Sequence, residues 1–137
     1  RVLFRSGIGW GIAAAIGVQL AQPDRRVVAI IGDGSAMYSP QALWTAAHLQ
    51  LPITFVILNN RGYRILKERL IAFHGDERFI GMDFKDPPID MAALSTALGT
   101  PGKQINKPEE FIACFSESLK STGPSLLEVM VEPGPGS

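Results

Sequence analysis

VVAIIGDGSAMYSPQALWTAAHLQLPITFVILNN, residues 27–60, is the stretch of this sequence that decides the fold. It contains two short apolar runs, 27–31 and 53–58, which are rich in Val and Ile and show no polar alternation. Such runs are typical of strands that are buried on both faces of a parallel sheet. Residues 40–49 between them have helix composition, and Ser39 is placed to cap that helix. The stretch therefore predicts a β-α-β unit.

Polar and glycine residues follow each of the two predicted strands. Gly32-Asp33-Gly34-Ser35 comes after the first strand, and Asn60 comes after the second. Because parallel strands end at the same edge of a sheet, Asp33 and Asn60 should meet at the edge where open α/β sheets bind ligands. The glycines let the backbone approach a ligand closely and Ser35 offers a hydroxyl donor, and both features suit a phosphate group.

An aspartate inside a phosphate-binding turn implies a cation, because the two negative charges repel each other. Mg²⁺ removes this conflict, since it takes oxygen ligands in an octahedron and usually combines one or two protein groups with substrate phosphates and water. The carboxylate of Asp33, the side-chain oxygen of Asn60 and a backbone carbonyl near Gly62 would be the protein ligands. These residues therefore predict a magnesium site that holds a diphosphate.

The order of these motifs also resembles a known family. GDGS, a helix, a strand and then NN is similar to the GDG…NN signature of thiamine-diphosphate enzymes. Residues 7–23 (GIGWGIAAAIGVQLAQP), 39–60 and 60–99 extend the resemblance over nearly the whole chain. They look most like the C-terminal diphosphate-binding domain of benzoylformate decarboxylase-type enzymes, a 2-oxo acid decarboxylase and carboligase family, and acetolactate-synthase-like relatives are the nearest competitors.

The resemblance implies a fold, two cofactors and a reaction. The fold would be α/β, a three-layer, open and mostly parallel sheet with helices on both faces, the thiamine-diphosphate-binding fold. The cofactors would be thiamine diphosphate and Mg²⁺, and the reaction would be non-oxidative cleavage of a 2-oxo acid to an aldehyde and CO₂. By the same resemblance the cofactor would contact Ile8, Gly32, Asp33, Gly34, Ser35, Asn60, Gly62 and Tyr63, with Asp33, Asn60 and Gly62 as metal ligands.

No catalytic side chain is expected within this chain. In the family, a glutamate from a pyrimidine-binding domain, normally in a partner subunit, activates the cofactor, and no segment here resembles that domain. We therefore expect a homo-oligomer for the full-length protein, and cofactor binding without turnover for this chain. An acetolactate-synthase-like carboligase, the diphosphate-binding subunit of a split enzyme and a non-catalytic binding module remain alternatives.

Composition narrows the class of protein. The 137 residues suffice for one domain, and 46% of them are hydrophobic and 19% charged, as in an α/β protein with a buried sheet. Lys plus Arg and Asp plus Glu are each 13, and this balance argues against nucleic-acid binding. Cys114 is the single cysteine and excludes an internal disulfide framework. The single cysteine also fits a reducing cytoplasm, where we expect this protein, and with no run long enough to span a bilayer we expect no membrane contact.

The chain divides into three expected parts. Residues 1–6 (RVLFRS) are interpreted as a non-native junction, 7–132 as the binding domain of a longer enzyme, and 133–137 as a tail. Two rival phosphate-binding folds fit poorly. A dinucleotide-binding fingerprint would need a small residue where Met37 stands, and a P-loop would need a Gly-Lys-Ser/Thr segment that the sequence lacks.

The remaining elements are expected from their caps and apolar patterns. They are helices over 61–71 and 90–98, a helix that begins at Pro108, and strands over 103–105 and 126–131. In the 61–71 helix the basic side chains should be solvated, and Ile65 and Leu66 should either line the substrate pocket or belong to the core. Asp83 should lie in a solvated loop, and His48 and His74 should have surface or packing roles.

Overall fold

A four-stranded sheet with helices on both faces forms the body of the molecule. The structure is a computed structural model, and it describes residues 7–75 and 77–133. The strands are β1 (Val27–Gly32), β2 (Ile53–Asn59), β3 (Gly102–Ile105) and β4 (Ser125–Met130). The helices are α1 (Gly11–Ala21), α2 (Asp33–Ala36), α3 (Ala42–His48), α4 (Arg64–His74), α5 (Met91–Ala97) and α6 (Pro108–Ser118).

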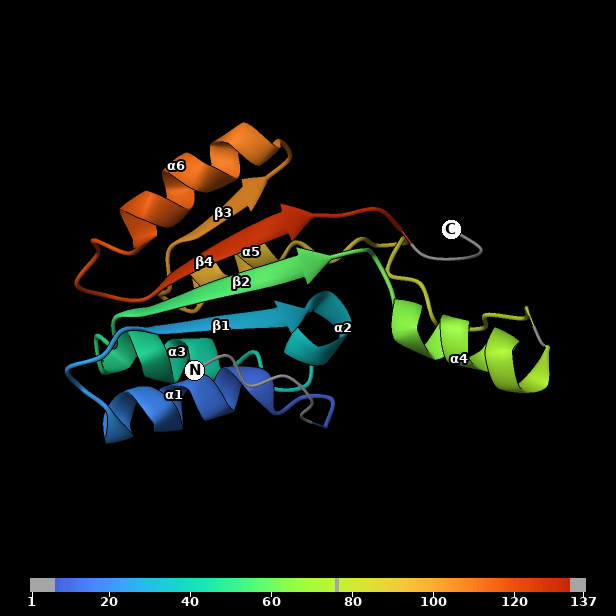
Figure 1. The fold of residues 1–137 in the computed structure, drawn as a ribbon, viewed down its shortest axis with the longest axis horizontal. Helices are drawn as coiled ribbons and strands as arrows, with labels where there is room; N and C mark the ends of the chain where they lie inside the picture. Colours follow the sequence, from blue (N-terminus) through green and yellow to red (C-terminus); the bar gives the residue numbers. More distant parts are fainter. Residues whose placement is uncertain (1–6, 76, 134–137) are drawn as a thin grey trace.

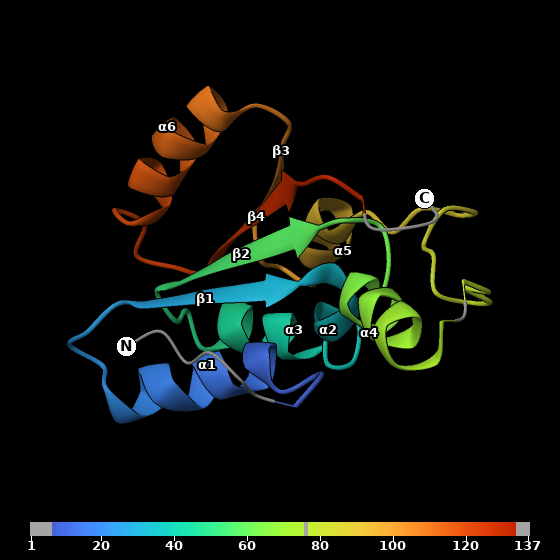
Figure 2. The ribbon, with the colours of Figure 1, turned by 45° about the vertical axis from the view of Figure 1, so that its right-hand side comes forward.

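The four strands are parallel and lie in the order β1-β2-β4-β3. From β1 to β2 and on to β3 the chain advances in one direction across the sheet, and from β3 to β4 it turns back. Right-handed crossovers then require that α6, in the returning connection, cover the opposite face from α3 and α5. Figures 1 and 2 show this arrangement, with α6 alone on one face. The expected α/β class with a parallel sheet and two helical layers is confirmed.

The buried side chains form two cores, and β2 contributes to the larger one. Ile53, Phe55 and Ile57 are fully buried and pack in one cluster with residues of α1, α3 and α5, including Ile12 and Leu43. The smaller cluster, on the α6 side, consists of Ile105, Cys114 and Leu127, with Phe111, Phe115 and Val129 against them. Cys114 is therefore a core residue.

Two local expectations are confirmed and one is wrong. Asp90 caps α5, where its carboxylate accepts from the N–H of Ala93 at 2.7 Å, and Pro108 stands in the first turn of α6. Ser39, however, caps no helix. Its hydroxyl donates instead to the carbonyl of Gly9 at 2.8 Å, and α3 begins three residues later, at Ala42. The side chain thereby ties the 7–9 turn to the rest of the domain.

Helix α4 differs most from its expected packing. It lies beyond the carboxyl ends of the strands and covers neither face of the sheet (Figure 1). Ile65 is 59% exposed and Leu66 is 38% exposed, whereas Lys67 is only 2% exposed. The expectation that the basic side chains of this helix are all solvated is therefore wrong for Lys67. An apolar helix face is buried only where another element packs against it, and among the described residues Ile65 and Leu66 are left exposed.

Within the described residues, no helix combines the length and the apolar character that a membrane crossing requires.

Gly102 marks the closest approach of β3 to α5. A Cβ added there would lie 2.8 Å from the Cα of Ala92 and would also clash with the Ala92 carbonyl and the Ser95 hydroxyl. We expect Gly102→Ala to lower the free energy of unfolding by about 1–3 kcal/mol, because the two backbones must separate. Urea unfolding measures this loss.

Gly17 provides the matched control. It is exposed on α1, and an added Cβ would meet no atom within 4 Å. Gly17→Ala should raise the free energy of unfolding by about 0.5–1 kcal/mol, because it removes a flexible residue from a helix interior. A Gly102→Ala protein as stable as the parent would show that α5 and β3 do not approach so closely.

Candidate functional site

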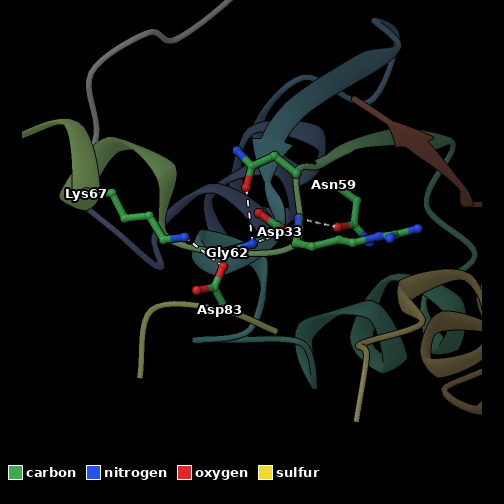
Figure 3. Close-up of polar contacts among 7 residues, drawn as sticks. Asp33, Asn59, Gly62, Lys67 and Asp83 are labelled. Atoms are coloured by element: carbon green, nitrogen blue, oxygen red, sulfur yellow. Dashed lines mark hydrogen bonds and ion pairs between the residues drawn. The ribbon is translucent and has the colours of Figure 1, made fainter. Parts of the chain in front are cut away.

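The carboxyl ends of β1 and β2 form the candidate site. Gly32 at the end of β1 pairs with Leu58 of β2, so the residues that follow each strand leave the sheet side by side. After Gly32 the chain turns directly into the short helix α2, and after Asn59 it enters a tight turn that leads to α4. Figure 3 shows the side chains that these segments bring together.

Asp33 is the buried anion of this site. Asp33 is only 2% exposed. Its two carboxylate oxygens accept hydrogen bonds from the N–H groups of Gly34 at 2.8 Å and Gly62 at 3.1 Å. Burial raises the pKa of Asp33, and the backbone N–H donors of Gly34, Gly62 and Arg61 oppose that rise. The carboxylate thus connects the turn after β1 with the turn after β2.

Asn60 points to the same place. Its Oδ1 atom accepts from the N–H of Gly62 at 3.2 Å, the same group that donates to Asp33 (Figure 3). Between them, Arg61 has a φ of +61°, a left-handed conformation that folds the chain back on itself. The three residues expected to be metal ligands, Asp33, Asn60 and Gly62, are therefore brought together at one turn.

The segment 82–84 holds this turn from outside. The N–H of Tyr63 donates to the carbonyl of Met82 at 2.9 Å, and the N–H of Phe84 donates to the carbonyl of Arg61 at 2.9 Å. A Cβ at Gly62 would lie 2.5 Å from the Met82 carbonyl oxygen, so only glycine fits under this segment. Part of the expected surface loop is therefore paired with the predicted metal-binding turn.

A buried ion pair reinforces the same contact. Lys67 Nζ lies 2.7 Å from the Asp83 carboxylate, and the lysine side chain is 2% exposed while that of Asp83 is 26% exposed. The Lys67 ammonium also lies 5.1 Å from the centre of the Phe79 ring. Asp83 lies in a loop and is partly exposed, as expected, but its carboxylate is also paired with Lys67. The reading of the sequence missed this pair because its members are far apart in the chain and neither belongs to a motif.

Ser35 and Ile8 lie where the chain segment before α1 meets α2. The Ser35 hydroxyl accepts a hydrogen bond from the N–H of Gly9 at 2.9 Å, and it retains an O–H group for donation. This bond, with that of Ser39, fixes the 7–9 turn beside α2. Ile8 in that turn is 47% exposed, so the described residues do not bury it in the core.

Tyr63 packs directly over the turn that contains Asp33. A Cβ at Gly34 would lie 2.7 Å from two ring carbons of Tyr63, and the ring meets Phe84 edge-on with 4.9 Å between centroids. The pKa of Tyr63 is raised by burial first and by the neighbouring Tyr38 next. Gly34 is therefore required here because a side chain would displace this ring.

The two asparagines of the NN motif have different environments. Asn60 accepts from the N–H of Gly62, whereas Asn59 donates from its Nδ2 atom to the carboxylate of Glu128 at 2.6 Å. Glu128 is fully buried on β4 and also accepts from the N–H groups of Met91 and Ala92. Glu128 was not among the predicted site residues, although an acidic residue inside an apolar strand is a signal that could have indicated it.

The donor set fits a hard cation better than a transition metal. In the described part of the chain, no group of three or more His, Cys, Asp or Glu side chains is placed to hold a metal ion. The site offers one carboxylate, one amide oxygen and backbone carbonyls at a sheet edge, and Mg²⁺ typically binds so few protein groups together with phosphate and water. The residues present therefore fit the expected magnesium and diphosphate.

Comparison with known proteins identifies the family. The sequence matches the family described as thiamine pyrophosphate enzyme, C-terminal TPP binding domain, over residues 4–129. This chain belongs to that family. The resemblance read from the GDGS and NN motifs is thereby confirmed, and so is the assignment to the C-terminal domain of a decarboxylase and carboligase family.

Two curated relatives are similar to the chain at nearly equal levels. It is 37% identical over 123 residues to benzoylformate decarboxylase of Pseudomonas aeruginosa. The aligned region covers 90% of this chain and 23% of that protein. It is 35% identical over 125 residues to acetolactate synthase isozyme 2 large subunit of Escherichia coli. The aligned region covers 91% of this chain and 22% of that protein. The chain therefore spans slightly less than a quarter of the length of either relative.

A solved structure shares the fold. The thiamine diphosphate-dependent 4-hydroxybenzoylformate decarboxylase of Rhodococcus jostii matches with a TM-score of 0.86 at 38% sequence identity, over 92% of this chain and 23% of that chain. Identity and fold thus agree on the family, while the relatives named here carry out different reactions according to their names.

Asp33 should make the metal-free protein less stable as the pH rises. The pKa of Asp33 in the folded protein lies above the ordinary value of 3.8. At a pH between 3.8 and the folded pKa, the folded state therefore keeps a proton that the unfolded chain has lost. The stabilising contribution is complete below pH 3.8 and is lost as the pH rises through the folded pKa. Urea unfolding at a series of pH values measures the slope, and Asp33→Asn, which does not titrate, should remove this component. An unchanged slope in the variant would contradict the assignment.

The Lys67–Asp83 pair should stabilise the fold measurably. Asp83→Asn should lower the free energy of unfolding by about 1–2 kcal/mol, because a buried ammonium loses the charge of the carboxylate beside it, with a discount for the partial exposure of Asp83. The exposed Arg64–Glu68 pair, with 2.8 Å between its atoms, is the control. Glu68→Gln should change stability by less than about 0.5 kcal/mol. Equal effects of the two substitutions in urea unfolding would show that burial adds nothing to the first pair.

Proposed function

We propose that this chain binds the diphosphate end of thiamine diphosphate through Mg²⁺, as part of a 2-oxo acid decarboxylase of the benzoylformate decarboxylase type. The convergence of Asp33 and Asn60 on the N–H of Gly62 carries the proposal. It brings a carboxylate and an amide oxygen from adjacent strands to the sheet edge where such folds bind ligands.

Each residue of the site has a distinct part in this proposal. Asp33, Asn60 and the carbonyl of Gly62 would hold Mg²⁺, while Gly32, Gly34 and Ser35 would border the diphosphate. Tyr63 lies over Gly34 and would limit the space beside it. Ile8, exposed in the turn that Ser35 holds, would support the middle of the cofactor.

The chemistry itself would come from the bound cofactor, which supplies a carbon nucleophile and an electron sink for the loss of CO₂ from a 2-oxo acid. This chain contributes anchoring and orientation. We assign the activating glutamate to a pyrimidine-binding domain outside this chain, in line with the quarter of each relative that the chain spans. The proposal also includes a homo-oligomeric full-length protein and a cytoplasmic location. The binding domain would comprise residues 7–132, and a tail would begin at residue 133. Residues 1–6 and 134–137 lie outside the described residues.

An acetolactate-synthase-like carboligase is the second candidate. The identity to the Escherichia coli acetolactate synthase subunit is 35%, against 37% for the benzoylformate decarboxylase. Both reactions use the same diphosphate anchor, so the site geometry is common to the two candidates. Ile65 and Leu66, exposed at the start of α4, remain candidates for the substrate pocket and would help to separate them.

Isothermal titration calorimetry tests the anchor directly. The chain should bind thiamine diphosphate when Mg²⁺ is present, and a chelator should abolish the binding, because the anion reaches Asp33 only through a cation. Asp33→Ala should weaken Mg²⁺-dependent binding by at least about tenfold.

Asp24→Ala is the matched control for this experiment. Asp24 is an exposed aspartate that precedes β1 at the opposite end of the sheet, so its loss should leave the affinity unchanged. Binding that persists in the chelator, or that Asp33→Ala leaves intact, would refute the proposed anchor.

A further inference from the structure

We propose that Glu128 is a positioning residue for the metal-binding turn, and that it acts on the turn through the side chain of Asn59. This inference rests on the proposed function, because the turn that it controls is the one that would bind Mg²⁺. Glu128 touches neither Asp33 nor Asn60 in the hydrogen bonds of the described residues. Its effect would therefore be indirect.

The environment of Glu128 is that of a buried and fully engaged carboxylate. The residue is 0% exposed, in the middle of β4 between Leu127 and Val129. Its Oε1 atom accepts from Asn59 Nδ2 at 2.6 Å and from the N–H of Met91 at 3.2 Å, and Oε2 accepts from the N–H of Ala92 at 3.1 Å. A charge in an apolar core is costly unless such donors surround it, so its presence there requires an explanation.

Attachment of α5 to β4 does not by itself explain this carboxylate. The shortest of its three bonds goes to the Asn59 side chain rather than to the helix backbone. Asn59 is 3% exposed and stands at the last position of β2, immediately before the turn. The carboxylate therefore reaches from the third strand of the sheet to the end of the second, where the candidate metal site begins.

Glu128 is the nearer of two acceptors that orient the Asn59 amide, since Asn59 Nδ2 also donates to the carbonyl of Ile89 at 3.5 Å. Both oxygens of Glu128 accept from N–H groups, and Asn59 presents its NH₂ group to Glu128. The Asn59 Oδ1 atom is then directed to the N–H of Arg61, which donates to it at 2.9 Å (Figure 3). A reversed amide would place its NH₂ group against the Arg61 N–H, two donors facing each other.

The bond to Arg61 fixes the residue on which the turn depends. Arg61 holds a φ of +61°, which side chains other than glycine rarely adopt, and it stands between Asn60 and Gly62. Its N–H is held by Asn59 and its carbonyl by the N–H of Phe84. If the hydrogen bond to Asn59 is lost, the backbone of Arg61 is held less firmly in its left-handed conformation. The oxygens of Asn60 and Gly62 are then no longer held at fixed positions relative to Asp33.

Glu128→Gln tests this chain of contacts in the 137-residue protein with two readouts. The amide keeps the size of the side chain but replaces one acceptor with a donor, which opposes the NH₂ group of Asn59 or an N–H of α5. In the metal-free protein, the nuclear magnetic resonance signals of the Arg61 and Gly62 N–H groups should shift. The affinity for Mg²⁺ with thiamine diphosphate, measured by calorimetry, should fall about tenfold or more.

Thr54→Val is the matched control. Thr54 is fully buried at the start of β2, and its hydroxyl donates to Ser118 at 3.2 Å, at the end of the strand away from the site. The substitution removes a buried polar contact of the same sheet. It should leave the Arg61 and Gly62 signals and the affinity unchanged, even where it lowers stability as much as Glu128→Gln does.

The double substitution Asn59→Asp with Glu128→Gln provides the rescue. It exchanges donor and acceptor between the two side chains, so residue 59 keeps an oxygen for the Arg61 N–H while residue 128 donates to it. The bond from the Met91 N–H to the same atom of residue 128 is lost. The Arg61 and Gly62 signals should return toward those of the parent. If Glu128→Gln alone fails to fold, the double variant decides: parent-like signals support the proposal and displaced signals overturn it.

Other results would overturn the proposal while leaving the function intact. Unmoved Arg61 and Gly62 signals in Glu128→Gln, or an affinity loss no larger than that of Thr54→Val, would make Glu128 a purely structural residue. If the parent chain shows no Mg²⁺-dependent binding, the proposed function fails. The metal-free signals still decide whether Glu128 controls the turn.

Discussion

The N–H group of Gly62 joins the ends of two strands, because it donates both to the carboxylate that follows β1 and to the amide that follows β2. Asp33 is buried at this junction, and its charge is tolerable only because backbone N–H groups surround it. The parallel pairing of β1 and β2 places the two strand ends together, but this one donor sets the separation of their side chains. Segment 82–84 and Asn59 then hold the turn that carries the donor.

The sequence was sufficient for the features that depend on neighbouring residues in the chain. Short Val- and Ile-rich runs indicated β1 and β2, and parallel topology then required Asp33 and Asn60 to lie at one edge. Asp90 capped its helix and Pro108 began another because capping depends on the local backbone. The family followed from the order of two motifs, and the match over residues 4–129 agrees with it.

The features that depend on distant contacts could not be obtained in this way. Ser39 follows the rule for a helix cap, yet its hydroxyl bonds to Gly9, thirty positions earlier in the chain. Lys67 stands in a basic run that favours solvent exposure, yet it is buried against Asp83 from a distant loop. Glu128 was recognisable as unusual within an apolar strand, but its partner Asn59 was not, since the register of β2 against β4 is a property of the folded sheet.

The pairing of residues 82–84 with 61–63 also restricts how the length of this connection can vary. Surface connections in α/β domains usually accept insertions and deletions, since their ends alone are fixed. Here the middle is fixed as well: Met82 and Phe84 bond to alternate positions of the turn, and Asp83 between them reaches Lys67. Removal of a single residue from segment 82–84 would shift its pairing with the turn by one position, and its remaining side chains would then point in the opposite direction. Natural length variation is therefore compatible with the site only on either side of these three residues.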